Sequence, residues 1–575
     1  MKIIGINFLH SDSSCSLIID GKVVAAVEEE RFMRIKHYNL FPYNSLQYCL
    51  DTANIKISEI DFFCFNFSNK YNFFNKIKYL VNNPSLLKKV KYKRLSRQKN
   101  ATDILKKLSI EKKKIKFVKH HLAHASSAYL FSGFTDAITF SFDGSGDFSC
   151  IEIFLCKQNK LKLLEKITFP NSLGLFYQMI THYLGFHAYG DEYKVMSLAA
   201  HGKNSLVKKL LHIFKIKEDN SFEIKKGYFK MENIFNFNID LLNNENKLFY
   251  TSKLEKLLKF PPRNPNEELN QNHKNLAHAT QFVFTLIAKN LIRKYEKYSE
   301  NLCITGGCAF NSVFCQSVKK DEIFKNIYVM PNSGDAGGGL GAAKYISSVK
   351  DNKFINYKLL NPYLGPSFTN KYILNLLNEK KMIELFKKHK IEFKHRTFNQ
   401  IKTIASTELN KGKIIFWFRG RAEFGPRALG NRSILANPLN KNTMEEINLT
   451  IKEREAFRPF APAVIDTYKD RYFFTHKDMN NFMNFVVNTK PNMRSLIPAV
   501  VHVDGTARAQ VVSNEINSDF FELIQEFGNL SGHPVLVNTS LNIQEPICNS
   551  PEDVLKTFIK SKVKNLFIED FYIYK

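Results

Sequence analysis

One pattern, a pair of short apolar strands joined by a polar or acidic turn, occurs twice in the chain. The first copy spans residues 3–19, and Asp20-Gly21 extends it with a tight hairpin. The second copy spans residues 137–154 around the acidic turn 143–147, which reads Asp-Gly-Ser-Gly-Asp. This repetition predicts an internal duplication whose turns can bring backbone amides near a phosphate group.

Two later segments each combine a strand, a glycine turn and a helix. Residues 302–305 run into Gly306-Gly307, and residues 327–330 run into a turn that contains Gly334. This arrangement presents the N-terminus of a helix to an anion. Together with the acidic turn, the two segments predict a nucleotide cleft, although glycines also serve ordinary close packing.

A pair of histidines predicts a metal site. His120 and His124 are four residues apart, so on a helix both imidazoles lie on one face and can bind one ion. The alternative is a chance pair of surface histidines. His121 falls off the ligand face, and we expect it to be replaceable.

Arginine is concentrated between residues 417 and 433. Because glycine, proline and an acid interrupt these arginines, the segment predicts a loop whose guanidinium groups fork onto phosphate or carboxylate oxygens. The alternative is a network of structural ion pairs with Glu423, Glu453 and Glu455. Further cations stand beside turn residues at Lys452, Arg454, Arg458 and Arg508.

Length and composition indicate a globular protein of several domains. The chain has 575 residues, of which 44% are hydrophobic, and its apolar runs are too short to cross a bilayer. Its nine cysteines show neither zinc-ribbon spacing nor a disulfide framework. We therefore expect a cytoplasmic protein with no membrane partner.

The net charge of +29 invites a nucleic-acid hypothesis. However, lysine is abundant throughout the chain alongside asparagine and isoleucine, and runs such as residues 87–94 are most simply solvated faces. We therefore rank nucleic acid low among the partners.

Composition also divides the chain. Residues 203–275 are rich in lysine and asparagine and carry no recognisable site, which predicts an insertion. A boundary falls near residues 347–362, and about 210 residues remain after it, enough for a separate domain. The predicted domains are 1–355 and 356–575.

Taken together, the motifs resemble those of the O-carbamoyltransferase family, typified by nodulation and aminoglycoside-antibiotic carbamoyltransferases. The matching stretches run in order along nearly the whole chain: 10–14, 28–32, 120–125, 192–196, the two glycine turns, 423–433, 457–462 and 537–540. The resemblance implies an α/β protein: a duplicated actin/sugar-kinase-like (ribonuclease H-like) N-terminal domain followed by a YrdC-like C-terminal domain.

The resemblance also implies a reaction. The C-terminal domain converts carbamoyl phosphate and ATP, with Mg²⁺, into carbamoyl adenylate, and the N-terminal domain transfers the carbamoyl group to a hydroxyl and releases AMP. We expect the acceptor to be a sugar or other small metabolite of polysaccharide or natural-product biosynthesis. A homodimer is compatible with this interpretation.

Site residues carry over from the family motifs. The implied metal ligands are His120, His124, Asp143 and Asp335, an N/O set suited to iron(II), manganese or zinc, with iron as the family precedent. His10 and Asp12 match positions near the acceptor, so either can be the general base. The catalytic cations are expected to be Arg421, Arg427, Lys452 and Arg458. The residues expected to bind nucleotide or carbamoyl phosphate are Gly144, Gly146, Lys194, Gly306, Gly307, Asn311, Gly334, Arg432, Arg454, Arg508, Asn538 and Ser540.

Two alternatives remain open at this point. A tRNA threonylcarbamoyl transferase would need only the N-terminal domain, so the fused arginine-rich domain disfavours it. A nucleotide-binding protein without catalytic activity is the other. The chain also departs from the family at Ser197, Cys308 and Phe310, which puts the shape of the acceptor pocket in doubt more than the chemistry.

Overall fold

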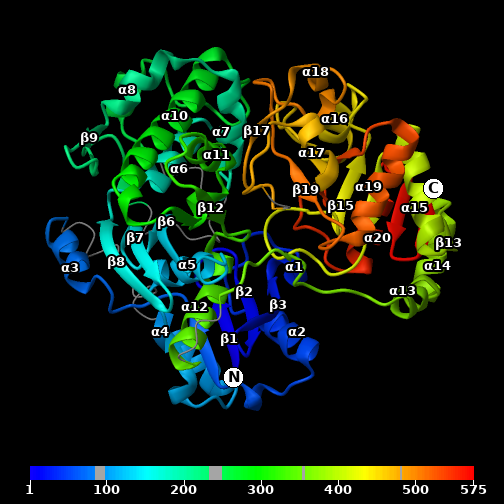
Figure 1. Ribbon diagram of the computed structural model, residues 1–575, viewed down its shortest axis with the longest axis horizontal. Coiled ribbons are helices and arrows are strands. Elements are labelled where there is room, and N and C mark those ends of the chain that lie inside the picture. The colour runs from blue at the N-terminus through cyan, green and yellow to red at the C-terminus, as the bar shows by residue number, and fades with distance from the viewer. Residues whose placement is uncertain (84–96, 232, 234–248, 352–355, 480–481) are drawn as a thin grey trace. The chain divides into compact units, whose positions relative to one another are not determined.

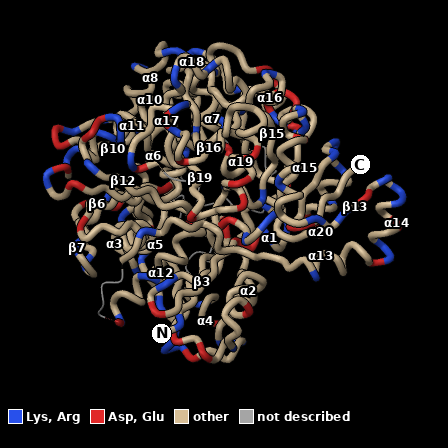
Figure 2. The backbone as a smooth tube through the Cα atoms, turned by 45° about the vertical axis from the view of Figure 1, so that its right-hand side comes forward, with Lys and Arg blue, Asp and Glu red and all other residues tan. Residues whose placement is uncertain are grey.

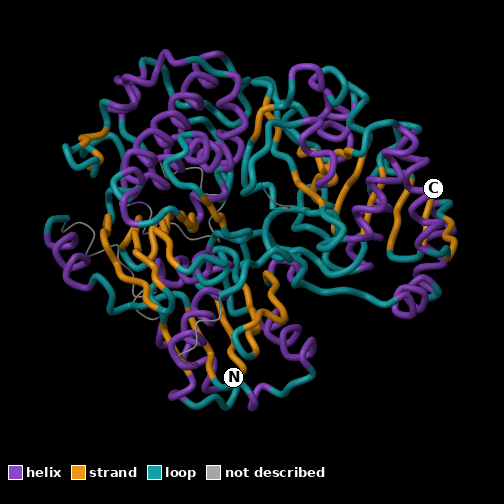
Figure 3. Tube along the Cα trace, in the orientation of Figure 1, coloured by secondary structure: helices purple, strands orange, loops and turns teal. Residues whose placement is uncertain are grey.

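The computed structural model describes residues 1–83, 97–231, 233, 249–351, 356–479 and 482–575. The lysine run 87–94, part of the predicted insertion and the middle of the predicted boundary lie outside these residues. The chain forms two compact units: unit 1 is Met1–Ala26 with His37–Leu359, and unit 2 is Val27–Lys36 with Leu360–Lys575. Helices and strands are interspersed through both units (Figures 1 and 3), which confirms the predicted α/β class.

Unit 1 contains two five-stranded sheets with the same topology. In each sheet the first strand lies in the middle, with an antiparallel partner on one side and two parallel strands on the other. The first sheet has the order β3 (Lys22–Glu28), β2 (Ser14–Ile19), β1 (Lys2–Asn7), β4 (Phe62–Phe65), β5 (Ile115–Phe117). The second has the order β8 (Lys160–Thr168), β7 (Ser149–Lys157), β6 (Asp136–Gly146), β11 (Asn301–Thr305), β12 (Asn326–Val329). The predicted duplication is therefore present.

The first hairpin forms where the sequence predicts it. Asp20 and Gly21 both have positive φ, at 48° and 79°, which is the conformation that a two-residue turn between twisted strands requires. The strands it joins are buried on their apolar positions, including Leu17 and Ala25. Local turn chemistry and burial therefore agree here.

The helices of unit 1 surround these sheets. They are α2 (Tyr43–Ala53), α3 (Phe73–Val81), α4 (Arg97–Lys107), α5 (His120–Tyr129), α6 (Leu173–Tyr183), α7 (Glu192–Leu198), α8 (Val207–Leu211), α9 (Ser252–Leu258), α10 (Gln271–Arg293), α11 (Ser312–Lys320) and α12 (Asp335–Asp351). The described part of the predicted insertion folds into α8, a small hairpin of β9 (Phe214–Ile216) and β10 (Phe222–Ile224), and α9. Phe214 packs edge-on against Phe176 of α6, with ring centroids 4.9 Å apart, so this segment packs onto the helices of unit 1.

Helix α12 packs closely against both β1 and α5. Its first two turns are rich in glycine, which leaves room for the neighbouring backbones. A Cβ on Gly341 would lie 1.9 Å from the carbonyl oxygen of Ala123 in α5, and one on Gly5 of β1 would lie 2.1 Å from that of Gly339. The glycines after Gly334 thus lie inside a helix and serve close packing. This packing brings the start of α12 beside the start of α5.

Unit 2 is built on one eight-stranded mixed sheet. Its order is β13 (Glu392–His395), β22 (Phe571–Tyr574), β21 (Asn565–Ile568), β14 (Ile415–Phe418), β15 (Arg432–Ala436), β20 (Val535–Ser540), β16 (Ala461–Ile465), β19 (Gln510–Val512). A separate pair joins β17 (Val487–Asn488) to β18 (Thr506–Ala507). The helices are α1 (Glu30–Met33), α13 (Asn370–Leu377), α14 (Lys380–His389), α15 (Phe398–Asn410), α16 (Thr443–Glu446), α17 (Lys469–Tyr472), α18 (Pro491–Arg494), α19 (Ser518–Ser531) and α20 (Pro551–Lys560).

Both faces of this sheet are covered, and β14 shows how. Ile415 and Trp417 belong to the core beneath α15 and α19, whereas Phe416 and Phe418 belong to the core on the opposite face. A strand that alternates between two apolar cores is apolar at every position, as the sequence Ile-Phe-Trp-Phe is. The sheet therefore forms the interior of unit 2.

Charged residues are spread along the chain. In Figure 2 lysine and arginine occur in many separate stretches of both units, interspersed with aspartate and glutamate. Among the described helices, none is both long enough and apolar enough to cross a membrane.

We expect Gly341→Ala to lower the free energy of unfolding by about 1–3 kcal/mol, since the added methyl group would force α12 away from α5. Urea denaturation measures this effect. Val349→Ala, at a half-exposed position of the same helix, is the control and should change stability by less than about 0.5 kcal/mol. Equal stabilities of the Gly341→Ala variant and the wild type would show that this contact is not tight.

Candidate metal centre and anion site

Four side chains of unit 1 meet at one point. His120 and His124 lie on the first two turns of α5, Asp143 lies near the end of β6, and Asp335 is the first residue of α12. Each contributes a ligand atom, and all four atoms lie within 4.8 Å of one another. Two consecutive elements, α5 and β6, and the distant α12 therefore build one cluster, which we call the metal centre.

The distances within the metal centre are short. Nε2 of His120 lies 2.9 Å from Oδ2 of Asp143 and 3.2 Å from Nε2 of His124. Oδ1 of Asp335 lies 3.4 Å from Nε2 of His124 and 3.6 Å from Nε2 of His120. All four groups thus direct nitrogen or oxygen atoms at a common space.

This donor set fits a divalent cation. Bonds of about 2.0–2.2 Å from an ion to nitrogen and oxygen place the ligand atoms of a tetrahedral site about 3.3–3.6 Å apart. The buried Oδ1 of Asp335 accepts no hydrogen bond from any described residue, although it faces the two imidazoles. A divalent cation held by the four side chains would give this oxygen a partner.

The electrostatics of the metal centre are those of a site that attracts positive charge. Burial would lower the pKa of His124, but the nearby carboxylates of Asp143 and Asp335 raise it to about 9. Burial would raise the pKa of Asp143, but the two histidines hold it well below its ordinary value. A proton held on His124 offsets part of the negative charge of the two carboxylates.

Glycine makes the close approach possible at two positions. A Cβ on Gly146 would lie 1.9 Å from the ring of His120, so only glycine lets the β6–β7 hairpin lie against that imidazole. Gly306, with φ of 87°, lies against the carbonyl of Phe142, and a Cβ there would be 1.9 Å from that oxygen. Both predicted glycines thus pack around Asp143.

His10 stands beside the metal centre in one defined tautomer. Nη1 of Arg97 lies 2.7 Å from Nε2 of His10, and because a guanidinium only donates, this nitrogen must accept. The proton then resides on Nδ1, which lies 3.6 Å from Oδ2 of Asp335. His10 therefore lies beside the metal centre, with its Nδ1 directed at the carboxylate of Asp335.

Asp12 forms a different pair. Its Oδ1 lies 2.7 Å from Nδ1 of His37, and both residues adopt positive φ, at 60° and 56°. The amide of Asn7 donates to the backbone oxygen of Asp12 at 2.9 Å and so holds this unusual conformation. Both side chains are about 30% exposed, so solvent and small molecules reach the pair.

Ser11 and Tyr189 link this region to the metal centre. The Ser11 hydroxyl lies 2.5 Å from the Tyr189 hydroxyl and 3.4 Å from Oδ2 of Asp335. The Tyr189 ring packs edge-on against His37, with centroids 4.9 Å apart. Nearby, burial raises the pKa of Glu192 to about 7.

The remaining predicted residues of unit 1 make local contacts. Lys194 pairs with Asp191 at 3.2 Å, Asn311 caps α11 by accepting from the amide of Phe314, and the Gly144 amide donates to Oδ1 of Asp143 at 2.7 Å. Additional methyl groups would lie 3.2 Å from Oδ1 of Asp143 at Gly307 and 2.8 Å from the ring of Phe310 at Gly334. Gly144 and Gly307 therefore both lie beside the ligand Asp143. His121 lies outside the ligand set and is buried, with Nδ1 2.7 Å from the Ser141 hydroxyl.

In unit 2, two predicted arginines hold backbone carbonyls. Arg432 is fully buried, its guanidinium lies 3.6 Å from the centroid of the Phe418 ring, and it donates to the oxygens of Arg419, Asn431 and Pro366. Arg421 donates to the oxygens of Leu364 and Gly365. These contacts fix the segment 364–366 against the arginine-rich loop, so the structure places Arg432 away from any open anion site.

Lys452 is also enclosed. Its ammonium donates to the oxygen of Ser540, to the hydroxyl of Ser540 at 3.1 Å and to the backbone and side-chain oxygens of Asn542 at 2.8 and 2.7 Å. Asn538 donates to Gln510 at 2.7 Å and to the oxygen of Ala428 at 3.2 Å. These residues together order the loop that follows β20.

Three further arginines form a cluster of positive charge with Lys452, which we call the cation cluster: Arg454, Arg458 and Arg508. Burial first, and then repulsion from Arg454 and Arg458, hold the pKa of Lys452 well below its ordinary value. Burial, together with Arg458, lowers the pKa of Arg508 to about 10. The buried Nε of Arg508 has no hydrogen-bond partner among the described residues. Cations that repel one another and leave a donor unsatisfied favour a bound anion.

The ion-pair alternative holds for part of this region. Arg458 lies 3.6 Å from Glu455, and Arg419 pairs with Asp519 and Asp570. Buried Glu423, however, accepts from the backbone amides of Leu429, Asn431 and Arg432, and so closes the loop itself. The Arg427 side chain, within that loop, donates to the oxygen of Phe482 at 3.3 Å.

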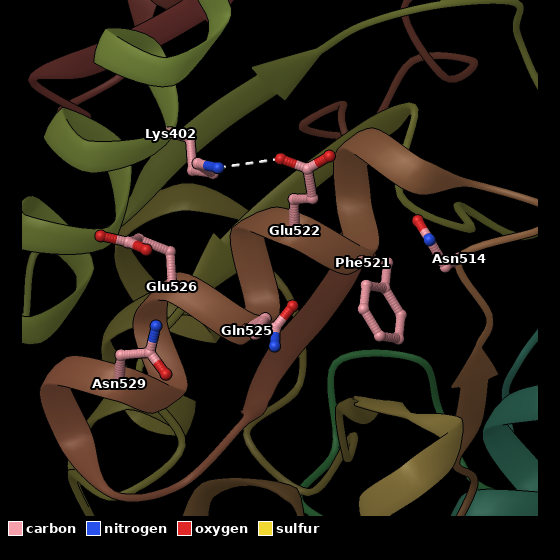
Figure 4. Close-up of a pocket in the computed structure, with 7 residues that line it drawn as sticks. All are labelled: Lys402, Asn514, Phe521, Glu522, Gln525, Glu526 and Asn529. Carbon is pink, nitrogen blue, oxygen red and sulfur yellow. Dashed lines mark hydrogen bonds and ion pairs between the residues drawn. The ribbon is translucent and has the colours of Figure 1, made fainter.

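Unit 2 also has a surface pocket, and its lining contains none of the predicted site residues. It is lined by Lys402, Asn514, Phe521, Glu522, Gln525, Glu526 and Asn529, mostly from α19, with Lys402 and Glu522 paired at 2.8 Å (Figure 4). None of these residues belongs to the metal centre or the cation cluster. We therefore place the chemistry elsewhere.

Sequence reasoning missed several residues around the metal centre: Ser11, His37, Arg97, Asp147, Tyr189 and Glu192. Asp147 could have been found, because it ends the same acidic turn that supplies Asp143. Arg97 had no such signal, since it follows a long lysine-rich stretch.

Comparisons with known proteins give a consistent picture. Nodulation protein NolNO of Sinorhizobium fredii is 33% identical, with 99% of this chain and 79% of the relative aligned. The uncharacterized protein sll1178 of Synechocystis is 32% identical over 100% of this chain and 96% of its own length. Among solved structures, HypF from T. kodakarensis covers 61% of this chain and 48% of its own at 12% identity and a TM-score of 0.29, which is too low to define a fold.

Two family descriptions match in order. Residues 2–344 match the carbamoyltransferase N-terminus, and residues 406–575 match the carbamoyltransferase C-terminus. The first match alone covers more than half of the chain and contains the whole metal centre, and the second contains the cation cluster. The chain belongs to the carbamoyltransferase family.

Proposed function

We propose that the protein is an ATP-dependent O-carbamoyltransferase that acts on a hydroxyl of a sugar or another small metabolite. The observation that carries this proposal is the convergence of His120, His124, Asp143 and Asp335 in a chain of this family. Such a centre suits transfer to a neutral hydroxyl, while the cation cluster of unit 2 suits the polyanionic substrates. The two kinds of chemistry therefore divide between the units.

Carbamoyl adenylate would form in unit 2. Water first hydrolyses carbamoyl phosphate to carbamate and inorganic phosphate. A carbamate oxygen then attacks the α-phosphorus of Mg²⁺-bound ATP and displaces pyrophosphate. Carbamoyl phosphate and ATP repel each other, and the cation cluster offsets this repulsion and orients the attack. Within it, Arg454, Arg458 and Arg508 would bind oxygens directly, with Arg427 nearby in the chain's arginine-rich loop.

Arg421, Arg432 and Lys452 would act differently. All three donate to backbone oxygens, so we assign them the positioning of the segment 364–366 and of the loop after β20. Asn538 and Ser540 belong to the same ordered region. Of the predicted cations, this assignment leaves Arg427, Arg454, Arg458 and Arg508 as candidates for direct contact with the anionic substrates.

The carbamoyl group would leave AMP in unit 1. The acceptor oxygen attacks the carbamoyl carbon, the bond to the adenylate oxygen breaks, and the hydroxyl proton passes to a base. An ion held by the four ligands, with iron(II) as the first candidate, supplies a Lewis acid that polarises the carbamoyl group. Asp12, ordered by its 2.7 Å contact to His37, is our candidate for the base.

His10 would then have a supporting role. Its Nε2 accepts from Arg97, so that nitrogen is already engaged, and its Nδ1–H is oriented toward Asp335. A neutral imidazole in this tautomer steadies a ligand rather than removing a proton. Of the two predicted bases, we therefore favour Asp12.

We expect His124→Ala to lower acceptor carbamoylation by about 100-fold or more, since loss of a ligand removes several kcal/mol of transition-state stabilisation. Transfer is measured as label moving from [¹⁴C]carbamoyl phosphate to a panel of hexoses and hexosamines. Pyrophosphate release that depends on carbamoyl phosphate should persist. His212→Ala, at an exposed position of unit 1, is the control. Loss of both half-reactions in His124→Ala alone would contradict the division between the units.

We expect the converse from Arg458→Ala. Removing one guanidinium from the cation cluster should lower pyrophosphate release by about 10²–10³-fold, as the loss of one preorganised donor to a developing charge does. Metal content should stay at the wild-type value. Arg471→Ala is the matched control. Arg471 is an exposed arginine of the same unit, and it donates to the backbone oxygen of Gly532. Unchanged pyrophosphate release in Arg458→Ala would remove the cation cluster from the reaction.

A further inference from the structure

Asp147 holds the helix that carries both histidine ligands. Its Oδ2 accepts from the backbone amide of His120 at 2.9 Å and from that of Ser68 at 2.8 Å. His120 is the first residue of α5, so the carboxylate binds an amide that the helix itself leaves unsatisfied. The contact fixes the backbone of a ligand, not its imidazole.

Helix α5 lacks a cap of its own. Lys119 stands at the N-cap position, and its side chain makes no capping hydrogen bond in the described part of the chain. A serine, threonine, asparagine or aspartate would ordinarily accept an amide there, and a negative charge near a helix N-terminus is stabilising. Asp147 supplies both functions from the β6–β7 hairpin.

The hairpin holds Asp147 in a special conformation. Asp147 and Phe148 both have positive φ, at 51° and 70°, and form the turn between the paired residues Gly146 and Ser149. Nδ2 of Asn72 donates to the backbone oxygen of Asp147 at 3.1 Å. A backbone in this region persists where its surroundings fix it, and such sites are often functional.

The five-residue turn 143–147 therefore makes three separate contacts that shape the metal centre. Asp143 supplies a ligand oxygen, Gly146 provides the space for the His120 ring, and Asp147 holds the His120 amide. These three contacts tie the position of α5 to that of Asp143. The histidine and aspartate ligands then keep a fixed separation.

We propose that Asp147 is a positioning residue for the metal centre, which sets His120 and Asp143 at the separation that one ion requires without touching the ion. The proposal rests on the proposed function, because it presumes that the four ligands hold a metal. It adds a residue outside the ligand set whose carboxylate determines metal affinity. Partners one step removed from a metal typically change its affinity by about 10–100-fold.

The test uses the full chain, stripped of metal and titrated with Co²⁺. We expect Asp147→Ala to weaken Co²⁺ binding about 10–100-fold and to change the d–d absorption bands, since His120 shifts relative to Asp143. Asp147→Asn keeps the shape and one acceptor oxygen, so its loss of affinity should be smaller. Asp136→Ala is the matched control: Asp136 begins the same strand β6, where it accepts from the Ser299 hydroxyl at 2.6 Å.

The outcomes separate this inference from the proposed function. If the wild type binds no Co²⁺ at a single tight site, the metal centre itself fails. If the wild type binds tightly and Asp147→Ala matches it in affinity and spectrum, the role of Asp147 fails while the metal centre stands. If Asp147→Ala does not fold, Asp147→Asn decides, and wild-type affinity and spectrum in that variant overturn the proposal. Carbamoyl phosphate-dependent pyrophosphate release should be unchanged in all three variants.

Discussion

Unit 1 is built around four ionisable groups that meet at one point, two buried imidazoles and two partly buried carboxylates. Two carboxylates and two imidazoles at 2.9–3.6 Å are stable inside a protein only if their charges compensate one another or a cation enters. The two carboxylates favour a positive charge beside them, and they raise the pKa of His124 for this reason. The glycines of α12, Gly146 and the cap supplied by Asp147 all serve to hold three elements around that point.

Unit 2 is arranged around charge of the opposite sign. Some of its arginines donate to backbone oxygens and hold loops in place, as Arg432 and Arg421 do. Others repel one another, as Arg458 and Arg508 do, and the buried Nε of Arg508 has no hydrogen-bond partner among the described residues. A residue of one type can thus be structural or a ligand, and its partners decide which. The reaction that we propose would use the anion-attracting unit for its polyanionic substrates and the cation-attracting unit for transfer to the neutral acceptor.

Much of the fold could be predicted from the sequence because its signals are local. The repeated strand pairs, the Asp20-Gly21 turn and the glycine turns each depend on neighbouring residues, and the structure has the duplicated topology that they indicate. The grouping of Asp143 and Asp335 with the histidines came from family motifs, because these residues are far apart in the chain. The metal-binding and catalytic roles of these residues stay predictions.

What could not be predicted depends on tertiary contacts. Nothing near Lys452 in the chain signals that Ser540 and Asn542 enclose its ammonium. The tautomer of His10 is fixed by Arg97, which lies 87 residues away. Nor does the sequence show that residues 27–36 belong to unit 2 while the strands before them belong to unit 1. These contacts join residues that are far apart in the sequence, so only the folded structure reveals them.

The central claim is that carbamoyl adenylate forms without the metal centre and is consumed only with it. A single-turnover quench experiment on wild-type protein tests this claim most directly, with transition metal removed by a chelator and Mg²⁺ supplied with ATP and carbamoyl phosphate. Mass spectrometry should find carbamoyl adenylate accumulating in stoichiometric amount, and added iron(II) with a sugar acceptor should convert it to AMP and a carbamoylated sugar. Absence of the adenylate from metal-free protein, or carbamoylated sugar formed without the metal, would contradict the account.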